Sequence, residues 1–475
     1  MPLSKKNKMI SEILKVSVSN ILKLLSGVLV GVLLPKIMGV TDYGYYKTFT
    51  LYIHYTGLFH FGLSDGIYLL YGGNSYKELN VYKFRLFTML FITIELVITI
   101  ILFSLSYFVL SDDSKFIFCC VALFLLANNI TSYFQMISQI TERFDELARR
   151  NIIQSILISL CVLILFVFSN KGNQEISYRI YIIIYLSVIF FLAIWYGFTY
   201  KTILIGPRHT FDVDISEIKQ LFRLGAPLLV SNLCSTLLLS LDRQFVSVLF
   251  DTDTYAIYAF AYNLLALVTT AVSAISTVIY PKMKRTSSNV LFINYNLFNS
   301  IIQILVFSML ILYYPLCFFV KLFLPKYLDS LAVFRIIFPG LAISSSITIV
   351  MHNYYKVLGI STQFFINSLI ALAVSILTNF IAYFSFKTTE SISIASIITM
   401  LLWYWITEKK IVRMGNISTN KNAAYLIVMI AFFYISTSAY SFVIGAIMYS
   451  IFLFCTTCLF FKSDIGNIVH LFHLR

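Results

Sequence analysis

Charged and polar side chains lie inside long apolar stretches of this sequence, where they are costly unless they face water or a partner. The clearest case is Lys23, near the middle of the apolar stretch 10–38 and with no acidic residue beside it. At about 100° per residue, a helix places Lys15, Ser19 and Lys23 on one side, together with Ser26. We expect this face, with two cations and hydroxyl groups, to border a hydrated cavity that accepts an anion.

Amide side chains form a second polar face in the stretch 116–140. Asn128, Gln135 and Gln139 share one side of a helix there, together with Ser132. Amides both donate and accept hydrogen bonds, as sugar hydroxyls require, and a lysine supplies a point charge for phosphate. We therefore predict a ligand that carries hydroxyls and phosphate, bound by Lys15, Lys23, Ser19, Asn128, Gln135 and Gln139. Pairing of these groups between helices is the alternative interpretation.

Titratable groups inside the next two stretches are candidates for ion coupling. In the stretch 44–71, a continuous helix would place His54 and Asp65 on one face with Lys47. Glu95 falls near the middle of the stretch 84–110. Such groups are rare within membrane spans, and histidine titrates near neutral pH. A structural pairing with neighbouring helices remains open for all three.

Catalytic, metal and redox chemistry find little support in the sequence. The seven cysteines lie in apolar runs, and Cys455 and Cys458 have redox spacing without a βαβ context. The acidic pairs Asp112-Asp113 and Asp251-x-Asp253 are typical of hydrated turns. The loops predicted outside are too short to carry a catalytic domain. We expect no catalytic residue, metal or cofactor, and hence a protein that is not an enzyme.

The composition is that of an integral membrane protein. The chain has 475 residues, of which 59% are hydrophobic and only 12% charged, with a mean hydropathy of +0.86. A soluble chain of this composition would have an apolar surface. The net charge of +14 sits mostly in short loops between apolar runs, which indicates membrane topology rather than nucleic-acid binding.

Fourteen apolar stretches are long enough to span a bilayer as helices. Lys and Arg gather in alternate loops, which places both termini in the cytoplasm. A count of twelve would follow if the short polar stretch ending at Ser441 were re-entrant. The predicted spans are 10–38, 44–71, 84–110, 116–140, 151–169, 179–200, 221–250, 254–280, 291–314, 330–357, 363–386, 390–411, 422–440 and 442–461.

A weak internal repeat divides these spans. The triplet at 18–20, Val-Ser-Asn, recurs at 230–232, and Tyr43 and Tyr46 match Tyr255 and Tyr258 at the same offset. Two similar halves that rock around a shared site are typical of secondary transporters. We predict an all-α protein with a six-helix lobe at 1–205, a second at 206–415, and a helix pair with a tail at 416–475.

Several segments resemble a known family of membrane proteins. The segment 34–46 (LPKIMGVTDYGYY) resembles the junction between the first two helices of polysaccharide flippases. Residues 62–67 and 71–73 are similar to the end of their second helix. Asp242-Arg243, the Tyr255 to Tyr258 stretch and residues 353–359 look like matching parts of their second half. The family is the Wzx-type (O-antigen) branch of the multidrug/oligosaccharidyl-lipid/polysaccharide exporter superfamily.

The resemblance implies two lobes around a central cavity and a flippase of the bacterial cytoplasmic membrane. Its cargo would be a polyprenyl-diphosphate-linked oligosaccharide for O-antigen, capsule or exopolysaccharide synthesis. The implied partners are this lipid-linked substrate, membrane lipids, and polysaccharide polymerase and export machinery. A drug or cation antiporter of the same superfamily is the alternative, for which Asp65 and Glu95 would supply the acids. A membrane polymerase or ligase is disfavoured by the short outer loops.

Overall fold

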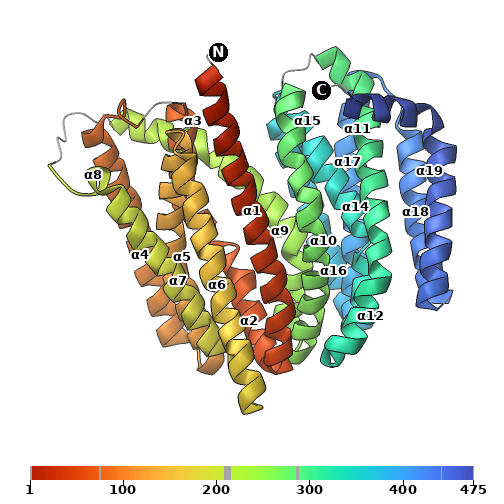
Figure 1. Ribbon diagram of the computed structural model, residues 1–475, viewed down its shortest axis with the longest axis horizontal. Coiled ribbons are helices and arrows are strands. Elements are labelled where there is room, and N and C mark those ends of the chain that lie inside the picture. Colours follow the sequence, from red (N-terminus) through yellow and green to blue (C-terminus); the bar gives the residue numbers. More distant parts are fainter. Residues whose placement is uncertain (1–2, 74–75, 208–214, 285–287, 440, 474–475) are drawn as a thin grey trace. The chain divides into compact units, whose positions relative to one another are not determined.

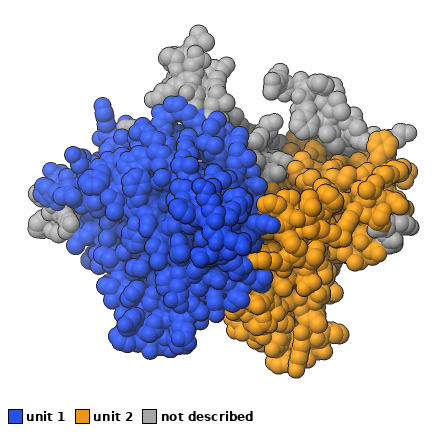
Figure 2. Space-filling model, turned by 60° about the horizontal axis from the view of Figure 1, so that its bottom comes forward, with its two compact units in different colours: residues 1–233 blue, residues 234–475 orange. Residues whose placement is uncertain are grey.

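Helices are the regular structure found throughout the part of the chain that the computed structural model describes, residues 3–73, 76–207, 215–284, 288–439 and 441–473 (Figure 1). The chain forms two compact units, residues 1–233 and 234–475, which are shown in different colours in Figure 2 and are described separately below. The predicted all-α membrane class is confirmed. The finer division at 205 and 415 stays a prediction. The terminal residues 1–2 and 474–475 lie outside the described residues.

Unit 1 is built on a set of long helices. Helix α1 packs along α6, α4 and α7 each pack against α5, and α2 contacts both α5 and α7. Helix α9 begins in unit 1 and continues into unit 2. The elements are α1 (Leu3–Ile37), α2 (Val40–Ile53), η1 (Thr56–His60), α3 (Leu63–Tyr71), α4 (Val81–Val109), α5 (Asp112–Ile140), α6 (Phe144–Gly172), α7 (Tyr178–Thr199), α8 (Lys201–Leu204) and α9 (Ile215–Leu249).

Unit 2 contains the remaining helices. Helix α16 packs on α17, and α11 contacts α17, α18 and α19. The elements are α10 (Thr252–Lys284), α11 (Ser288–Met309), η3 (Leu310–Leu312), α12 (Tyr313–Phe323), η4 (Pro325–Tyr327), α13 (Ser330–Ile337), α14 (Gly340–Ser345), η5 (Ser346–Met351), α15 (His352–Val357), α16 (Ser361–Phe386), α17 (Thr389–Gly415), α18 (Asn420–Ala439) and α19 (Phe442–His473).

Each predicted span coincides with helical structure. Eleven helices of the described residues are long and apolar enough to cross a membrane, and the bent pair 330–337 and 340–357 makes twelve if it is one span. The two other predicted spans correspond to the broken α2–α3 segment and to α10. Large apolar side chains point outward, such as Phe108, Phe198 and Leu459, each at least 74% exposed. An outer surface of this kind fits the hydrocarbon of a bilayer, so the chain is a multi-pass membrane protein.

The internal repeat is visible in the helix bounds. Helix α1 ends at Ile37 and α9 ends at Leu249, an offset of 212 residues, which is the offset of the sequence repeat. The next helix begins at Val40 in one unit and at Thr252 in the other, again at this offset. The predicted repeat is therefore confirmed at the level of the helices.

Asp251 explains why α10 begins where it does. The backbone N–H and the hydroxyl of Thr254 donate to its two carboxylate oxygens, at 2.9 and 2.8 Å. This satisfies one of the amides left open at a helix start. The same hydrogen bonds hold the pKa of the Asp251 carboxyl below its usual range.

The second predicted span is broken rather than continuous. Helix α2 ends at Ile53, a short 3₁₀ turn follows, and α3 begins at Leu63. Phe61 and Gly62 between them have left-handed backbone angles, with φ of 49° and 83°. Such angles interrupt an α-helix, and glycine adopts them without strain. The expectation that one continuous face runs from Lys47 to Asp65 is therefore wrong.

The break lets the start of α9 approach the backbone of α3 within unit 1. A Cβ added at Gly66 would collide with the carbonyl of Leu221, and one at Gly225 would collide with that of Gly62. Glu217, at the start of α9, accepts a hydrogen bond from Tyr71 and pairs with Lys83 at 2.8 Å. Residues 217–225 of α9 thus pack tightly against α3 and α4 within unit 1.

Candidate functional site

A cavity in unit 1 contains the mid-helix lysine. It has a volume of about 210 Å³ and lies among α1, α2, α6 and α7. Lys23 is exposed there rather than packed in the core. The lining residues are Lys23, Ser26, Gly27, Val30, Tyr46, Thr50, Ile53, Gln154, Ser155, Ile158, Tyr181 and Tyr185.

Contacts between the four helices hold the walls of this cavity in place. The Ser26 hydroxyl of α1 donates to the Ser155 carbonyl of α6 at 3.2 Å. Tyr46 of α2 meets Tyr181 of α7 edge to face, with ring centroids 5.2 Å apart. Aromatic pairs of this geometry stabilise by about 0.5–1.5 kcal/mol beyond their buried area. The two rings therefore form packed walls of the cavity that Lys23 lines.

The cavity is cationic and rich in hydrogen-bonding groups. None of its lining residues is acidic, and among the described residues no carboxylate is recorded in an ion pair with Lys23. Lys47 is not a lining residue, but it lies over the rings of Tyr43 and Tyr46, at 5.2 and 5.6 Å from their centroids. Tyrosine hydroxyls and the Gln154 amide can meet hydroxyl groups of a ligand. This chemistry suits an anion that also carries hydroxyls.

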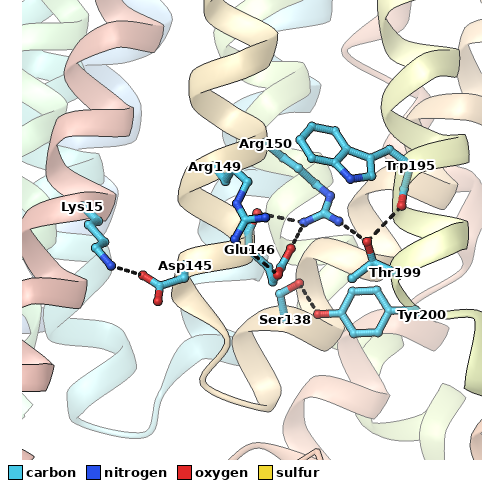
Figure 3. A network of polar contacts seen from close by, with 9 residues as sticks. All are labelled: Lys15, Ser138, Asp145, Glu146, Arg149, Arg150, Trp195, Thr199 and Tyr200. Carbon is cyan, nitrogen blue, oxygen red and sulfur yellow. Dashed lines mark hydrogen bonds and ion pairs between the residues drawn. The ribbon is translucent and has the colours of Figure 1, made fainter.

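Of the six predicted substrate-binding residues, the structure brings only Lys23 to this cavity. Lys15 forms an ion pair with Asp145 of α6 at 2.8 Å, about half exposed, as Figure 3 shows. Ser19 is buried, and its hydroxyl donates to the Val16 carbonyl of its own helix. Both residues lie on the predicted side of α1, but neither lines the cavity.

The three predicted amides of α5 are also outside the cavity lining. Asn128 and Gln135 are half-buried and Gln139 is exposed. The cavity takes its amide from Gln154 of α6, which the sequence interpretation missed. Gln154, Tyr46, Tyr181 and Tyr185 come from three different helices, so no spacing along one stretch identifies them. The tyrosine at position 46 was marked by the repeat and by the segment 34–46, and neither assigned it to a cavity.

Glu95 lies in a buried polar contact elsewhere in unit 1. Its side chain is fully buried, and one carboxylate oxygen accepts from the Asn129 amide at 2.9 Å. Asn129 also donates to the Thr56 carbonyl at 3.0 Å, next to the break after α2. The sequence analysis had instead named Asn128, the residue before Asn129, as a substrate-binding amide. The contact therefore ties α4 and α5 to the broken segment.

The other two ion-coupling candidates are separated by the helix break. His54 follows α2 and is exposed. Asp65 instead lies beside His60, with 3.9 Å between the imidazole Nε2 and the carboxylate. The histidine partner of Asp65 is thus five residues away, across the turn at Phe61 and Gly62, which a helical wheel cannot anticipate.

Arg150 is a buried cation whose contacts connect two helices of unit 1 (Figure 3). It is 1% exposed and pairs with Glu146 at 2.5 Å, while its other Nη donates to the Thr199 hydroxyl at 2.5 Å. The guanidinium also lies over the rings of Trp195 and Tyr196, at 4.7 and 4.0 Å. This set joins α6 to α7 through side chains that already contact the guanidinium. Among the described residues, no group of three His, Cys, Asp or Glu side chains could hold a metal ion.

Solved structures with a similar fold are membrane transporters. The lipid II flippase MurJ in an inward-closed conformation matches with a TM-score of 0.67 and 16% identity, over 96% of this chain and 100% of that one. An inward-facing multidrug resistance MATE family transporter of the MOP superfamily matches at 0.56 and 13%, over 86% and 99%. A MOP superfamily transporter from Pyrococcus furiosus, described by a reverse polarity of its binding pocket, matches at 0.53 and 12%, over 84% and 95%.

At these identities the comparison shows the fold alone, which is that of MOP superfamily transporters. A search of curated protein sequences finds no match. A family model described as polysaccharide biosynthesis protein matches residues 10–287, more than half of the chain. The chain therefore belongs to the polysaccharide biosynthesis protein family.

Proposed function

We propose that this protein is a flippase that moves a polyprenyl-diphosphate-linked oligosaccharide from the cytoplasmic to the outer leaflet of the bacterial cytoplasmic membrane. Membership of the polysaccharide biosynthesis family and the MurJ-like fold support a lipid-linked glycan as cargo. The proposed pathway is that of a surface polysaccharide such as O-antigen, with polymerase and export machinery as partners. In the proposed topology both chain ends are cytoplasmic.

The observation that carries the proposal is the acid-free cavity around Lys23. A diphosphate needs cations that are accessible and not already paired, and Lys23 meets both conditions among the described residues. A lysine ammonium is a compact point charge with three donors, which suits a hydrated phosphate. The Gln154 amide and the tyrosine hydroxyls would meet the first sugar or the second phosphate.

Moving this cargo requires that its sugar hydroxyls stay hydrogen-bonded and that an energy source drives its anionic head group outward. Each sugar hydroxyl that enters hydrocarbon unpaired costs on the order of several kcal/mol, and a hydrated cavity removes this cost. The membrane potential, negative inside, favours outward movement of an anion by about 2.3 kcal/mol per charge per 100 mV. Alternating access between the two units would then deliver the head group to the outer face. His54, Asp65 and Glu95 are the proposed coupling residues if an ion exchange assists this cycle.

Export of surface glycan in a strain that lacks the native gene tests the role of Lys23. Lys23→Ala should abolish export at normal membrane levels, because it removes the cation from the cavity. Lys23→Arg should retain part of it, because charge matters more than shape for a hydrated diphosphate. Lys410→Ala, which removes an exposed lysine of unit 2, is the matched control and should export normally. Full export by Lys23→Ala would remove the basis of the proposal.

The buried carboxyl of Glu95 favours a second candidate, a drug or cation antiporter. One of its oxygens has no hydrogen-bond partner and its side chain is fully buried, as a proton-coupled acid would require. In that case Glu95→Gln should abolish efflux of a cationic dye from proteoliposomes while Lys23→Ala leaves it intact. Dye efflux that depends on Glu95 together with glycan export that ignores Lys23 would replace the flippase by the antiporter.

A further inference from the structure

Helix α7 of unit 1 (Figure 1) separates two apolar hollows that the proposed transport site does not use. The larger hollow has a volume of about 400 Å³ and lies among α4, α5, α7 and α8, and the smaller, of about 300 Å³, lies between α6 and α7. Ile194 and Phe198 line both hollows and are 58% and 74% exposed, so their side chains form a ridge between them. We call the two hollows with this ridge the α7 groove pair.

The walls of the groove pair suit hydrocarbon chains. Apart from Lys201, the lining residues of the larger hollow are apolar or glycine. Ala193 and Gly197, spaced by four residues on one face of α7, leave this hollow wide because their side chains are small. A Cβ added at Gly197 would touch only the Leu204 side chain, at 3.5 Å, so the space beside this glycine is open. The smaller hollow is lined by large apolar side chains, among them Trp195.

A basic side chain lies at one end of each hollow. Lys201 lines the larger hollow just past the end of α7, is exposed, and takes part in no ion pair of the described residues. Arg149 precedes Ile153, which lines the smaller hollow, by four residues of α6, so the two share a helix face. The Arg149 side chain is 59% exposed, and the carboxylate of its partner Glu146 lies 3.8 Å away.

These two basic residues lie at the same end of the groove pair. Arg150, next to Arg149, donates to the hydroxyl of Thr199, two residues before Lys201, at 2.5 Å (Figure 3). Glu146 pairs with Arg150 at 2.5 Å, so the charge of this carboxylate is already balanced. The positive charges of Arg149 and Lys201 are therefore left for a ligand. In the proposed topology this end of α7 faces the cytoplasm.

We propose that the α7 groove pair binds one phospholipid with two acyl chains and an anionic headgroup, such as phosphatidylglycerol. One chain lies in each hollow, on either side of the ridge of Ile194 and Phe198, and the phosphate lies at the end where Lys201 and Arg149 supply charge. Basic pockets between helices on the cytoplasmic side of a membrane bind anionic headgroups. A zwitterionic lipid brings a cation to the same place and is disfavoured by charge. The bound lipid fills the space beside α7 and so joins it to α4, α5 and α6.

Native mass spectrometry of the full-length purified protein measures this binding without a transport assay. Dioleoylphosphatidylglycerol or dioleoylphosphatidylcholine is added at equal concentration, so that the chains are the same and only the headgroup differs. One phosphatidylglycerol should bind with an affinity at least tenfold above that of phosphatidylcholine. Lys201→Gln should remove most of this preference, because it takes away charge at the headgroup. Gly197→Leu should weaken the binding of phosphatidylglycerol at least tenfold, because the added side chain fills the larger hollow.

Two variants are the matched controls. Lys171→Gln removes an exposed lysine at the opposite end of α6 and should keep the native headgroup preference. Gly197→Ala adds only a methyl group, which meets Leu204 at an ordinary contact distance, and should keep native binding. If Gly197→Leu fails to fold, Lys201→Gln, which changes an exposed side chain, decides alone. Equal affinity of the native protein for the two lipids would overturn the proposal, and so would an unchanged preference in Lys201→Gln or unchanged binding by a folded Gly197→Leu.

Discussion

The two units place equivalent tyrosines in opposite electrostatic settings. Tyr46 lines the cavity that contains Lys23 in unit 1. Tyr258, its partner in the repeat, is fully buried in unit 2 and donates to the carboxylate of Asp242 at 2.8 Å. Tyr262 donates to the same carboxylate oxygen. One unit thus uses this position beside an accessible cation, and the other beside a buried anion.

The difference shows that the repeat preserves the scaffold and not the chemistry. The C-terminal ends of α1 and α9 coincide at the repeat offset, yet the position of Lys23 is occupied by Ser235 in α9. At this repeat position the exposed cation belongs to unit 1, whereas in unit 2 two carboxylates, Asp242 and Glu408, accept hydrogen bonds from tyrosine hydroxyls. The comparison therefore sets the exposed Lys23 of unit 1 against the tyrosine-bonded Asp242 of unit 2.

Moving the lysine between equivalent positions should have the largest effect. In the double variant Lys23→Ser with Ser235→Lys, the net charge and the repeat position are kept, but the cation leaves the cavity of unit 1. We expect loss of surface glycan export equal to that of Lys23→Ser alone, at normal membrane levels. Restored export in the double variant would show that either unit can supply the cation, and the contrast between the units would be lost.

Removing the two equivalent hydroxyls should affect different properties. Tyr258→Phe takes one donor from a buried carboxylate, so the free energy of unfolding should fall by about 1–3 kcal/mol. Tyr46→Phe removes a hydroxyl from a cavity wall and keeps its ring contact with Tyr181, so it should lower export and leave stability nearly unchanged. Denaturant unfolding and glycan export, measured on both variants, separate the two outcomes. Equal destabilisation by both would contradict the comparison.

The smallest effect is expected at Lys15. Its ion pair with Asp145 is about half exposed, and such pairs contribute about 0–1 kcal/mol. Lys15→Ala should therefore lower stability by less than about 1 kcal/mol and preserve most export, in contrast to Lys23→Ala. Membrane level and surface glycan are the measurements. A loss of export as deep as that of Lys23→Ala would extend the substrate site along α1 to Lys15.

Sequence periodicity predicted the helices well because long apolar runs leave few other structures in a membrane. It also identified Lys23, because one lysine in an apolar run is conspicuous. Sequence periodicity gave a wrong helix face where the backbone interrupts the helix. The left-handed angles at Phe61 and Gly62 rotate Asp65 away from the face of His54, so its partner became His60.

The sequence also could not predict sites whose residues come from several helices. The Gln154 amide reaches the Lys23 cavity from α6, and nothing along its own stretch marks it. The predicted amide face of α5 contained Asn128, whereas Asn129, about 100° further round the helix, is the residue that contacts Glu95. The sequence did not single out Tyr295 and Asn299 of α11, because their partners Glu408 and Tyr404 lie on a different helix, α17.

The close crossing of α9 over α3 has a consequence for biogenesis. Gly66 and Gly225 lie at backbone contact, and Glu217 bonds to Tyr71 and Lys83, so residues 217–225 complete the packing of unit 1. During synthesis these residues leave the ribosome after all six preceding spans. The first lobe therefore stays unfinished until the seventh span has begun to emerge, and a half-protein cut at residue 205 would lack its own final packing surface.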